Sequence, residues 1–180
     1  MKNIFFKSLL ALIFSTTVVC AQGDAKKMSA IKNITDNVSK AAHLSALSTG
    51  LKGTSMAKKF SGKGNYTFFA INDAGFDKTL HGTTQKMLSP EYLPMLDKIL
   101  NFHTVDGKLN IKDLKAKVNG AKGVLMLKTL NGESLKITIE NDQLVIADKK
   151  GNKAKIVEGD IKQGNGILHI IDAMLLPEAL

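Results

Sequence analysis

The stretch that decides the fold is GNGILHIIDAMLLP, residues 164–177. Gly164, Asn165 and Gly166 are turn residues, and an apolar run follows from Ile167 to about Leu176. A turn followed by β-branched and apolar residues predicts a buried strand. A phosphate-binding glycine loop would have to open a helix, so this glycine pair is not expected to hold a phosphate.

The preceding segment alternates between apolar runs and turn residues. Asn131-Gly132 separates the runs 124–130 and 133–140, and Asn-Gly is typical of a tight hairpin because both residues tolerate positive φ. Asn141-Asp142 and residues 148–152 mark two further turns, before strands expected at 144–147 and 154–157. This third of the chain therefore predicts an antiparallel meander.

Helical spacing dominates the first half of the chain. A stripe that begins near Ile31 and continues through Leu44, Leu47 and Leu51 places apolar residues on one face, and Met56 extends it. We expect helices over 29–51, 56–60, 73–76, 89–100 and 111–120, and strands over 66–71 and 102–105. Asp73 is expected to cap the helix that follows it, and Ser89 to cap the next one, with Pro90 in its first turn. Helices followed by a meander predict an α+β fold.

The N-terminus has the order of a secretory signal. Lys2 and Lys7 precede an apolar run from 9 to 19, and small residues follow at Cys20 and Ala21. We expect a signal peptide over 1–21, a flexible leader over 22–28 and a single domain over 29–180. The alternative is a lipid anchor on Cys20 at the cell surface. No other run is long enough to span a membrane.

Composition excludes several classes of function. All 25 basic residues are Lys, against 16 acidic residues, for a net charge of +9. The lack of Arg argues against a specific nucleic-acid reader, since Arg supplies the bidentate fork for bases and phosphates. A single Cys excludes an intrachain disulfide, and the four His have no metal-ligand spacing. With no G-x-S-x-G either, we expect no metal, no cofactor and no catalysis. An undetected hydrolase is the competing hypothesis in the enzyme class.

Three blocks together carry a family resemblance. They are YTFFAINDAGF (66–76), NFHTVDGKL (101–109) and the stretch 164–177. Their order and spacing resemble the fasciclin domain. The resemblance implies a β-sandwich-like wedge with helices packed on one side, and a secreted adhesion or extracellular-matrix module. The composition is typical of a bacterial protein. The family's signature and structural positions correspond to Phe68, Asn72, Asp73, Phe76, Gly166, His169, Asp172 and Pro177.

Phe102 and His103 are one candidate contact site. In animal adhesion members the matching Tyr-His region is linked to integrin binding, but Phe102 lacks the tyrosine hydroxyl, so we do not expect an integrin-type contact. A structural role is the competing interpretation of His103. We expect His169, in mid-strand, to be a core histidine bonded to the backbone.

Lysines form the other candidate site. Lys149, Lys150, Lys153 and Lys155 surround one hairpin turn, and a second group follows one helix (Lys112, Lys115, Lys117 and Lys122). Such groups are either a solvated face or a patch for acidic polysaccharide, anionic lipid headgroups or extracellular DNA. The predicted partner is a matrix or cell-surface protein or an acidic polysaccharide, and the chain is expected to be monomeric.

A second function hypothesis is a carrier of a small apolar ligand, in the periplasm or outside the cell. Its groove would lie between helices and sheet, lined by Leu44, Leu47, Leu51 and Met56.

Overall fold

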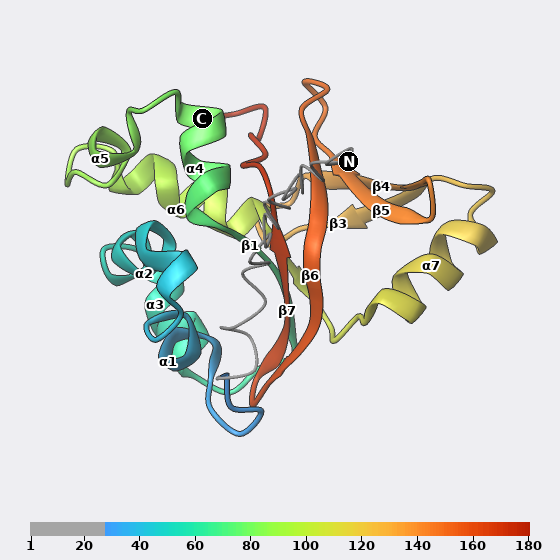
Figure 1. The fold of residues 1–180 in the computed structure, drawn as a ribbon, viewed down its shortest axis with the longest axis horizontal. Coiled ribbons are helices and arrows are strands. Elements are labelled where there is room, and N and C mark those ends of the chain that lie inside the picture. Colours follow the sequence, from blue (N-terminus) through green and yellow to red (C-terminus); the bar gives the residue numbers. More distant parts are fainter. Residues whose placement is uncertain (1–27) are drawn as a thin grey trace, which may run out of the picture.

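The computed structural model describes residues 28–180. The predicted signal peptide, with Cys20, and residues 22–27 of the leader lie outside the described residues. In the described part most helices come first and most strands last, which confirms the α+β order (Figure 1). No helix within residues 28–180 is both long and apolar enough to cross a membrane.

The elements of the described part have the following bounds. The helices are α1 (Ile34–Val38), α2 (Ser45–Lys52), α3 (Ser55–Ser61), α4 (Asp73–Leu80), α5 (Thr84–Met87), α6 (Leu93–Phe102) and α7 (Ile111–Gly120), with one 3-10 turn, Ala42–Leu44. The strands are β1 (Tyr66–Ile71), β2 (Thr104–Asp106), β3 (Leu125–Lys128), β4 (Ser134–Glu140), β5 (Gln143–Ala147), β6 (Lys153–Gln163) and β7 (Gly166–Ile171).

The strands form one sheet in the order β2-β1-β7-β6-β5-β4-β3. Strands β3 to β7 pair as the predicted antiparallel meander. The last strand then lies parallel to β1, in register from Tyr66 beside Gly166 to Ile71 beside Ile171. The sheet is therefore mixed, and stretch 164–177 joins the meander to the N-terminal half of the chain.

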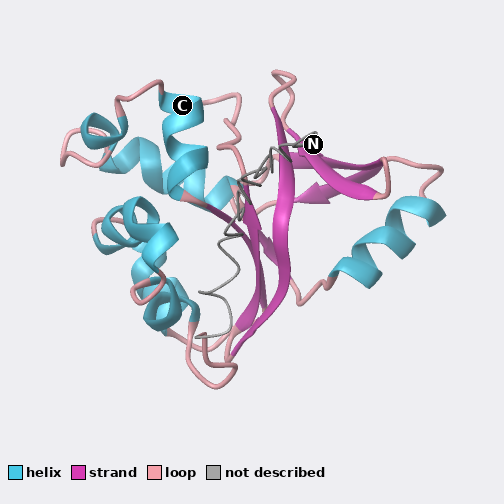
Figure 2. Cartoon of the chain, in the orientation of Figure 1, coloured by secondary structure: helices cyan, strands magenta, loops and turns pink. Residues whose placement is uncertain are grey.

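The sheet bends almost into a barrel. Strand β6 pairs with β5 over residues 153–155 and with β7 over residues 156–163, and the β6–β7 register shifts twice between Ile156 and Ile161. The two edges of the sheet, β2 and β3, meet where Val105 bridges Thr129. There the Leu130 N–H donates to the Thr104 carbonyl at 2.8 Å. Helices α1 to α6 pack at one side, and α7 lies apart from them (Figures 1 and 2).

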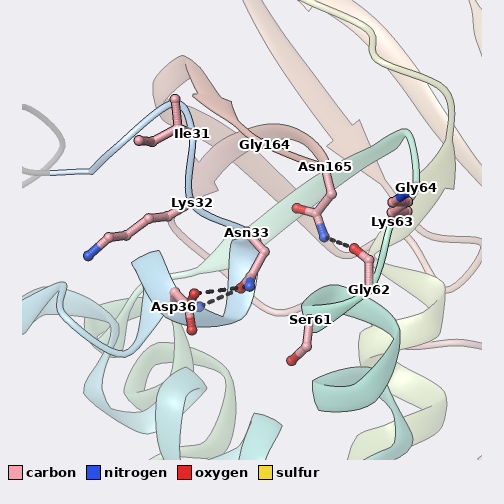
Figure 3. Close-up of a pocket in the computed structure, with 10 residues that line it drawn as sticks. All are labelled: Ile31, Lys32, Asn33, Asp36, Ser61, Gly62, Lys63, Gly64, Gly164 and Asn165. Carbon is pink, nitrogen blue, oxygen red and sulfur yellow. Dashed lines mark hydrogen bonds between the residues drawn. The ribbon is translucent and has the colours of Figure 1, made fainter.

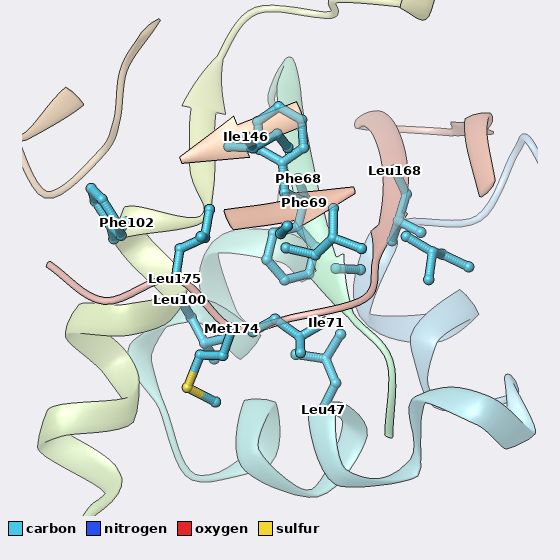
Figure 4. Packing of buried hydrophobic residues seen from close by; sticks show 14 of the residues in the cluster. Leu47, Phe68, Phe69, Ile71, Leu100, Phe102, Ile146, Leu168, Met174 and Leu175 are labelled. Atoms are coloured by element: carbon cyan, nitrogen blue, oxygen red, sulfur yellow. The ribbon is translucent and has the colours of Figure 1, made fainter. Parts of the chain in front are cut away.

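The hydrophobic core lies between this sheet and the helices. Figure 4 shows side chains from helices and strands meeting there, among them Leu47, Phe68 and Leu168. Leu44, Leu47, Leu51 and Met56 are all at most 1% exposed. The four residues assigned to a carrier groove are therefore packed core, and that part of the carrier hypothesis is wrong.

Several predicted helix boundaries are also wrong. Helix α1 begins only at Ile34, behind an Asn33 cap, and Ile31 outside it is 89% exposed. Helix α6 begins at Leu93, so Ser89 is in the turn before it rather than at its cap. Phe102 belongs to the end of α6, not to a strand, because the apolar spacing of that helix continues through it.

The two-residue hairpin turn connects β4 to β5. The sequence predicted it one connection earlier, at Asn131-Gly132 between β3 and β4. Among residues 130–133 only Gly132 has positive φ, and the β3–β4 loop is longer than two residues. Asn141 and Asp142, with φ of 50° and 61°, connect Glu140 directly to Gln143 across β4 and β5. Two successive positive φ values give the twist that a two-residue hairpin needs.

Candidate functional site

The signature residues Asn72 and Asp73 cap two different helices. The Asn72 side chain caps α4 by accepting from the Gly75 N–H at 2.7 Å. Asp73 was expected to be that cap, which is wrong: its carboxylate instead accepts from the Ser45 and Ala46 N–H groups at 3.2 and 2.8 Å. It thereby satisfies free donors at the start of α2, 28 residues earlier in the chain.

The other signature residues are also placed by packing and backbone contacts. Phe68 and Phe76 are fully buried, and Pro177 is buried near the C-terminus. A Cβ on Gly166 would lie 2.5 Å from the Tyr66 carbonyl oxygen, so the parallel pairing of β7 with β1 needs glycine there. Asp172 accepts from the Lys155 N–H at 2.7 Å.

His169 and His103 are both fully buried and use both ring nitrogens on the backbone. His169 Nε2 lies 2.9 Å from the Leu109 carbonyl and its Nδ1 accepts from the Asp160 N–H at 3.2 Å. This confirms the predicted core histidine. His103 has the opposite arrangement: Nδ1 lies 2.8 Å from the Ile99 carbonyl and Nε2 accepts from the Leu175 N–H at 3.0 Å.

These contacts require neutral rings. A protonated ring would place an N–H against the Leu175 or the Asp160 N–H. Burial accordingly lowers the pKa of His103 from 6.5 to about 4, against smaller raising effects of the Ile99 carbonyl and Asp148. Burial also lowers the pKa of His169.

The candidate contact site at Phe102 and His103 is not on the surface. Phe102 is 1% exposed and its ring meets the His103 ring edge to face. The absent hydroxyl at Phe102 is therefore consistent with a side chain inserted into the core. As a site for a partner this prediction is wrong, because neither side chain reaches solvent.

The lysines around the β5–β6 hairpin are exposed, but two of them form ion pairs. Lys149 Nζ lies 2.6 Å from Glu178 Oε2, and Lys153 Nζ lies 2.8 Å from Glu140 Oε1. The hydrogen bond that Lys149 donates to Glu178 raises the pKa of Lys149. Lys150 and Lys155 are also exposed. Exposed pairs of this kind contribute little stability, so they leave the ammonium groups able to exchange partners.

Strand register reveals a larger set of lysines on the same face. Met126, Lys136, Ala147 and Lys153 are neighbours in register across β3, β4, β5 and β6. Residues alternate between the two faces of a sheet, so these side chains lie opposite the buried Leu135. We name this outer surface, with its five lysines, the basic sheet face: Lys128, Lys136, Lys149, Lys153 and Lys155.

A trough of about 320 Å³ lies on the basic sheet face. It is lined by Met126, Ser134, Lys136, Ala147, Asp148, Lys149, Gly151 and Lys153. Asp148 is only 5% exposed there, and its carboxylate accepts from the Asn152 N–H, the Asn152 amide and the Leu176 N–H at 2.7–2.9 Å. The lining thus combines an apolar floor with ammonium groups at its rim.

The pKa of Glu140 is affected by the lysines of this face. The hydrogen bond from Lys153 lowers its pKa, and the charges of Lys155 and Lys136 lower it further. Lys136, Lys128 and Met126 were not among the predicted site residues. The alternation of Leu135, Ile137 and Ile139 with polar residues was the signal that could have placed Lys136 on the wet face.

The second lysine group lies on or just beyond α7 rather than on the sheet. Lys112 and Lys117 are exposed there, and Lys115 forms an ion pair with Asp142 at 2.7 Å. These residues are positively charged like those of the basic sheet face, but they line neither the trough nor the hollow beside α1. Substitutions in this group therefore serve as controls for substitutions on the basic sheet face.

A second hollow, of about 410 Å³, lies between the start of α1, the end of α3 and the β6–β7 turn (Figure 3). Its central side chain is Asn165, which accepts from the Ile34 N–H at 3.0 Å and donates to the Phe60 and Gly62 carbonyls at 2.6 and 2.9 Å. That amide is saturated by the fold, so its role is to join three segments. Within residues 28–180, no three His, Cys, Asp or Glu side chains are grouped to hold a metal.

Comparisons with known proteins agree on one family. A family model described as the Fasciclin domain matches residues 42–177. A protein of the cyanobacterium Synechocystis, sll1483, is 30% identical over 133 residues, which cover 74% of this chain and 67% of that protein. Pig transforming growth factor-beta-induced protein ig-h3 is 29% identical over 75% of this chain but only 18% of its own length.

A solved structure shares the fold. It is a FAS1 domain pair from the insect cell adhesion molecule Fasciclin I, with a TM-score of 0.69 and 24% identity over 82% of this chain. This chain spans about half of that one (51%) and a small part of ig-h3.

Proposed function

The chain belongs to the fasciclin domain family, and from this premise we propose that it is a secreted, non-enzymatic adhesion module. In this role it contacts extracellular matrix or a cell surface as a monomer. The structural relative named above is described as a cell adhesion molecule, which supports this class of function. The observation in this chain that carries the proposal is the basic sheet face.

The basic sheet face suits a binding role for physical reasons. Four of its five lysines lie on strands and Lys149 lies in the β5–β6 turn. Glu140 pairs with Lys153, and Glu178 pairs with Lys149. A surface whose charge is mainly positive attracts anionic partners over about a Debye length, roughly 8–10 Å at physiological salt. Lys contributes hydrated point charges rather than a bidentate fork, so this contact would be salt-sensitive.

The buried titratable groups fit a structural rather than a catalytic role. His103 and His169 have the altered pKa values that often mark active sites. Each nevertheless has both ring nitrogens engaged by backbone groups in the core. A general base needs a nitrogen within reach of a substrate proton, and neither ring offers one.

Export and anchoring form a separate part of the proposal. We propose cleavage after Ala21, with a lipid on Cys20 as the alternative. The mass of the protein isolated from its host distinguishes the two. A chain that begins at Gln22 supports free secretion, and a diacylated chain that begins at Cys20 replaces it with an anchored form.

The adhesion proposal is tested by binding of purified protein to an array of matrix proteins and glycans at low and near-physiological salt. Binding to one class of matrix component supports it. No binding to any component at low salt would remove adhesion as the function, since that condition favours charge-driven contacts most strongly.

A further inference from the structure

We propose that the trough on the basic sheet face binds a linear acidic polysaccharide, with Lys136, Lys149 and Lys153 contacting its carboxylate or sulfate groups. This inference rests on the proposed adhesion function and specifies the partner. Three features support it: the apolar floor of the trough, the spacing of its lysines, and a lining without aromatic residues or Arg.

The floor of the trough is apolar. Met126 and Ala147 lie in the same cross-strand row as Lys136 and Lys153, and Met126 is 52% exposed. An exposed, flexible thioether adapts to irregular apolar surfaces. The C–H faces of sugar rings are such surfaces, and a trough of about 320 Å³ is within the range of small-molecule sites. The floor therefore fits a few sugar units of one chain.

The charges are placed to meet a series of anions. Lys136 and Lys153 are separated by one strand, β5, so their backbones lie about 10 Å apart. Lys155 follows Lys153 on the same face of β6, about 7 Å further along the strand. Flexible ammonium groups at these spacings can reach successive acidic groups on an extended polymer.

Nucleic acid fits this lining less well. None of the eight residues that line the trough is aromatic, so nothing there can stack on an exposed base. The lining also has no Arg to grip phosphates in bidentate fashion. A duplex is too wide to enter the trough and would contact only its rim.

The two ion pairs at the rim are part of the site. Glu140 pairs with Lys153, and Glu178 pairs with Lys149. Because both pairs are exposed, acidic groups of a ligand can replace these carboxylates at little cost. Removing the charge of Glu140 should consequently tighten binding of a polyanion, since it no longer competes for Lys153.

The experiment measures binding of the full protein to polygalacturonate, a linear polymer of uronic acid, at low salt. Its methyl-esterified form is the neutral counterpart. The site variant is Lys136→Glu with Lys153→Glu. The control variant is Lys112→Glu with Lys117→Glu, which makes the same change of net charge on α7. Thermal unfolding of each variant verifies that the fold is kept.

The expected result is a loss of roughly tenfold to a hundredfold in affinity for the site variant and less than about threefold for the control variant. Met126→Ala should weaken polygalacturonate binding severalfold without changing its salt dependence, and Glu140→Gln should strengthen it. Equal losses in the two double variants would overturn the proposal, because net charge alone would then explain binding. Tighter binding of duplex DNA, or of phosphatidylglycerol vesicles, than of polygalacturonate would also overturn it.

A parallel assay tests the adhesion function separately from the polysaccharide site. Attachment of protein-coated beads to matrix proteins and cell surfaces tests adhesion directly. Attachment without polygalacturonate binding refutes the polysaccharide site and leaves adhesion standing. Polygalacturonate binding without attachment refutes adhesion and leaves the site standing.

Discussion

Replacing His103 by Gln should make the folded state less sensitive to acid. His103 holds its second nitrogen as an acceptor for the buried Leu175 N–H, and burial lowers its pKa to about 4. In the unfolded chain the ring takes up a proton near its ordinary pKa of 6.5. Protons therefore favour the unfolded state as pH falls below that value.

The size of the effect follows from the two pKa values. A difference of about 2.5 pKa units corresponds to about 3 kcal/mol of the free energy of unfolding. This stability is fully present above about pH 6.5 and falls as pH drops towards 4. About 2 kcal/mol is lost by pH 5 and about 3 kcal/mol by pH 4.

Gln keeps part of the geometry and does not titrate. Its carbonyl oxygen can accept from the Leu175 N–H, while the Ile99 carbonyl still accepts from the backbone N–H of residue 103. We expect His103→Gln to cost about 1–2 kcal/mol at pH 7, from imperfect packing and one lost hydrogen bond. At pH 4 the variant should be the more stable protein, so the two stability curves cross near pH 5.

Urea unfolding at pH 7, 6, 5 and 4 measures this difference. Circular dichroism is the suitable signal, because the chain has no Trp for fluorescence. Carboxylates titrate in both proteins, so only the difference between them is attributed to His103. Parallel curves from pH 7 to pH 4 would refute the reasoning, since the buried ring would then not be the acid-sensitive group.

Substitutions at three further signature residues test their structural roles. His169→Ala should destabilise the fold by about 1–3 kcal/mol at pH 7, because it removes a buried ring and leaves the Asp160 N–H and the Leu109 carbonyl without their partner; unchanged urea unfolding would contradict that. Gly166→Ala should cost about 1–3 kcal/mol in the same measurement, since its Cβ would lie 2.5 Å from the Tyr66 oxygen. Asp73→Ala should lower stability by about 1–2 kcal/mol through loss of the α2 cap, seen as a lower thermal midpoint, whereas Asp73→Asn should retain part of the cap.

Local signals predicted the elements of the fold well. The stripe through Leu44, Leu47 and Leu51 is buried as its spacing indicates, and the runs between turn residues became strands β3 to β6. The boundaries failed where a contact distant in sequence decides them. Asp73 can cap either the helix it begins or α2, and only the packing of α4 beside α2 selects the second.

The candidate site was only partly predictable for the same reason. Lys149 and Lys153 stand out because they crowd a turn, but Lys136 joins them only because β4 pairs with β5 and β5 pairs with β6. Phe102 and His103 looked like a contact site because of their place in the motif. Burial of both was not visible, since an aromatic and a histidine occur both on surfaces and in cores.

The central claim is that the basic sheet face gives this chain its adhesive contact. The most direct measurement is attachment of protein-coated beads to matrix and cell surfaces at about 0.15 M salt. The Lys136→Glu, Lys153→Glu variant is compared with the Lys112→Glu, Lys117→Glu variant. The account predicts that attachment is lost in the first and kept in the second. Attachment that survives in the first variant, or disappears equally in both, would contradict it.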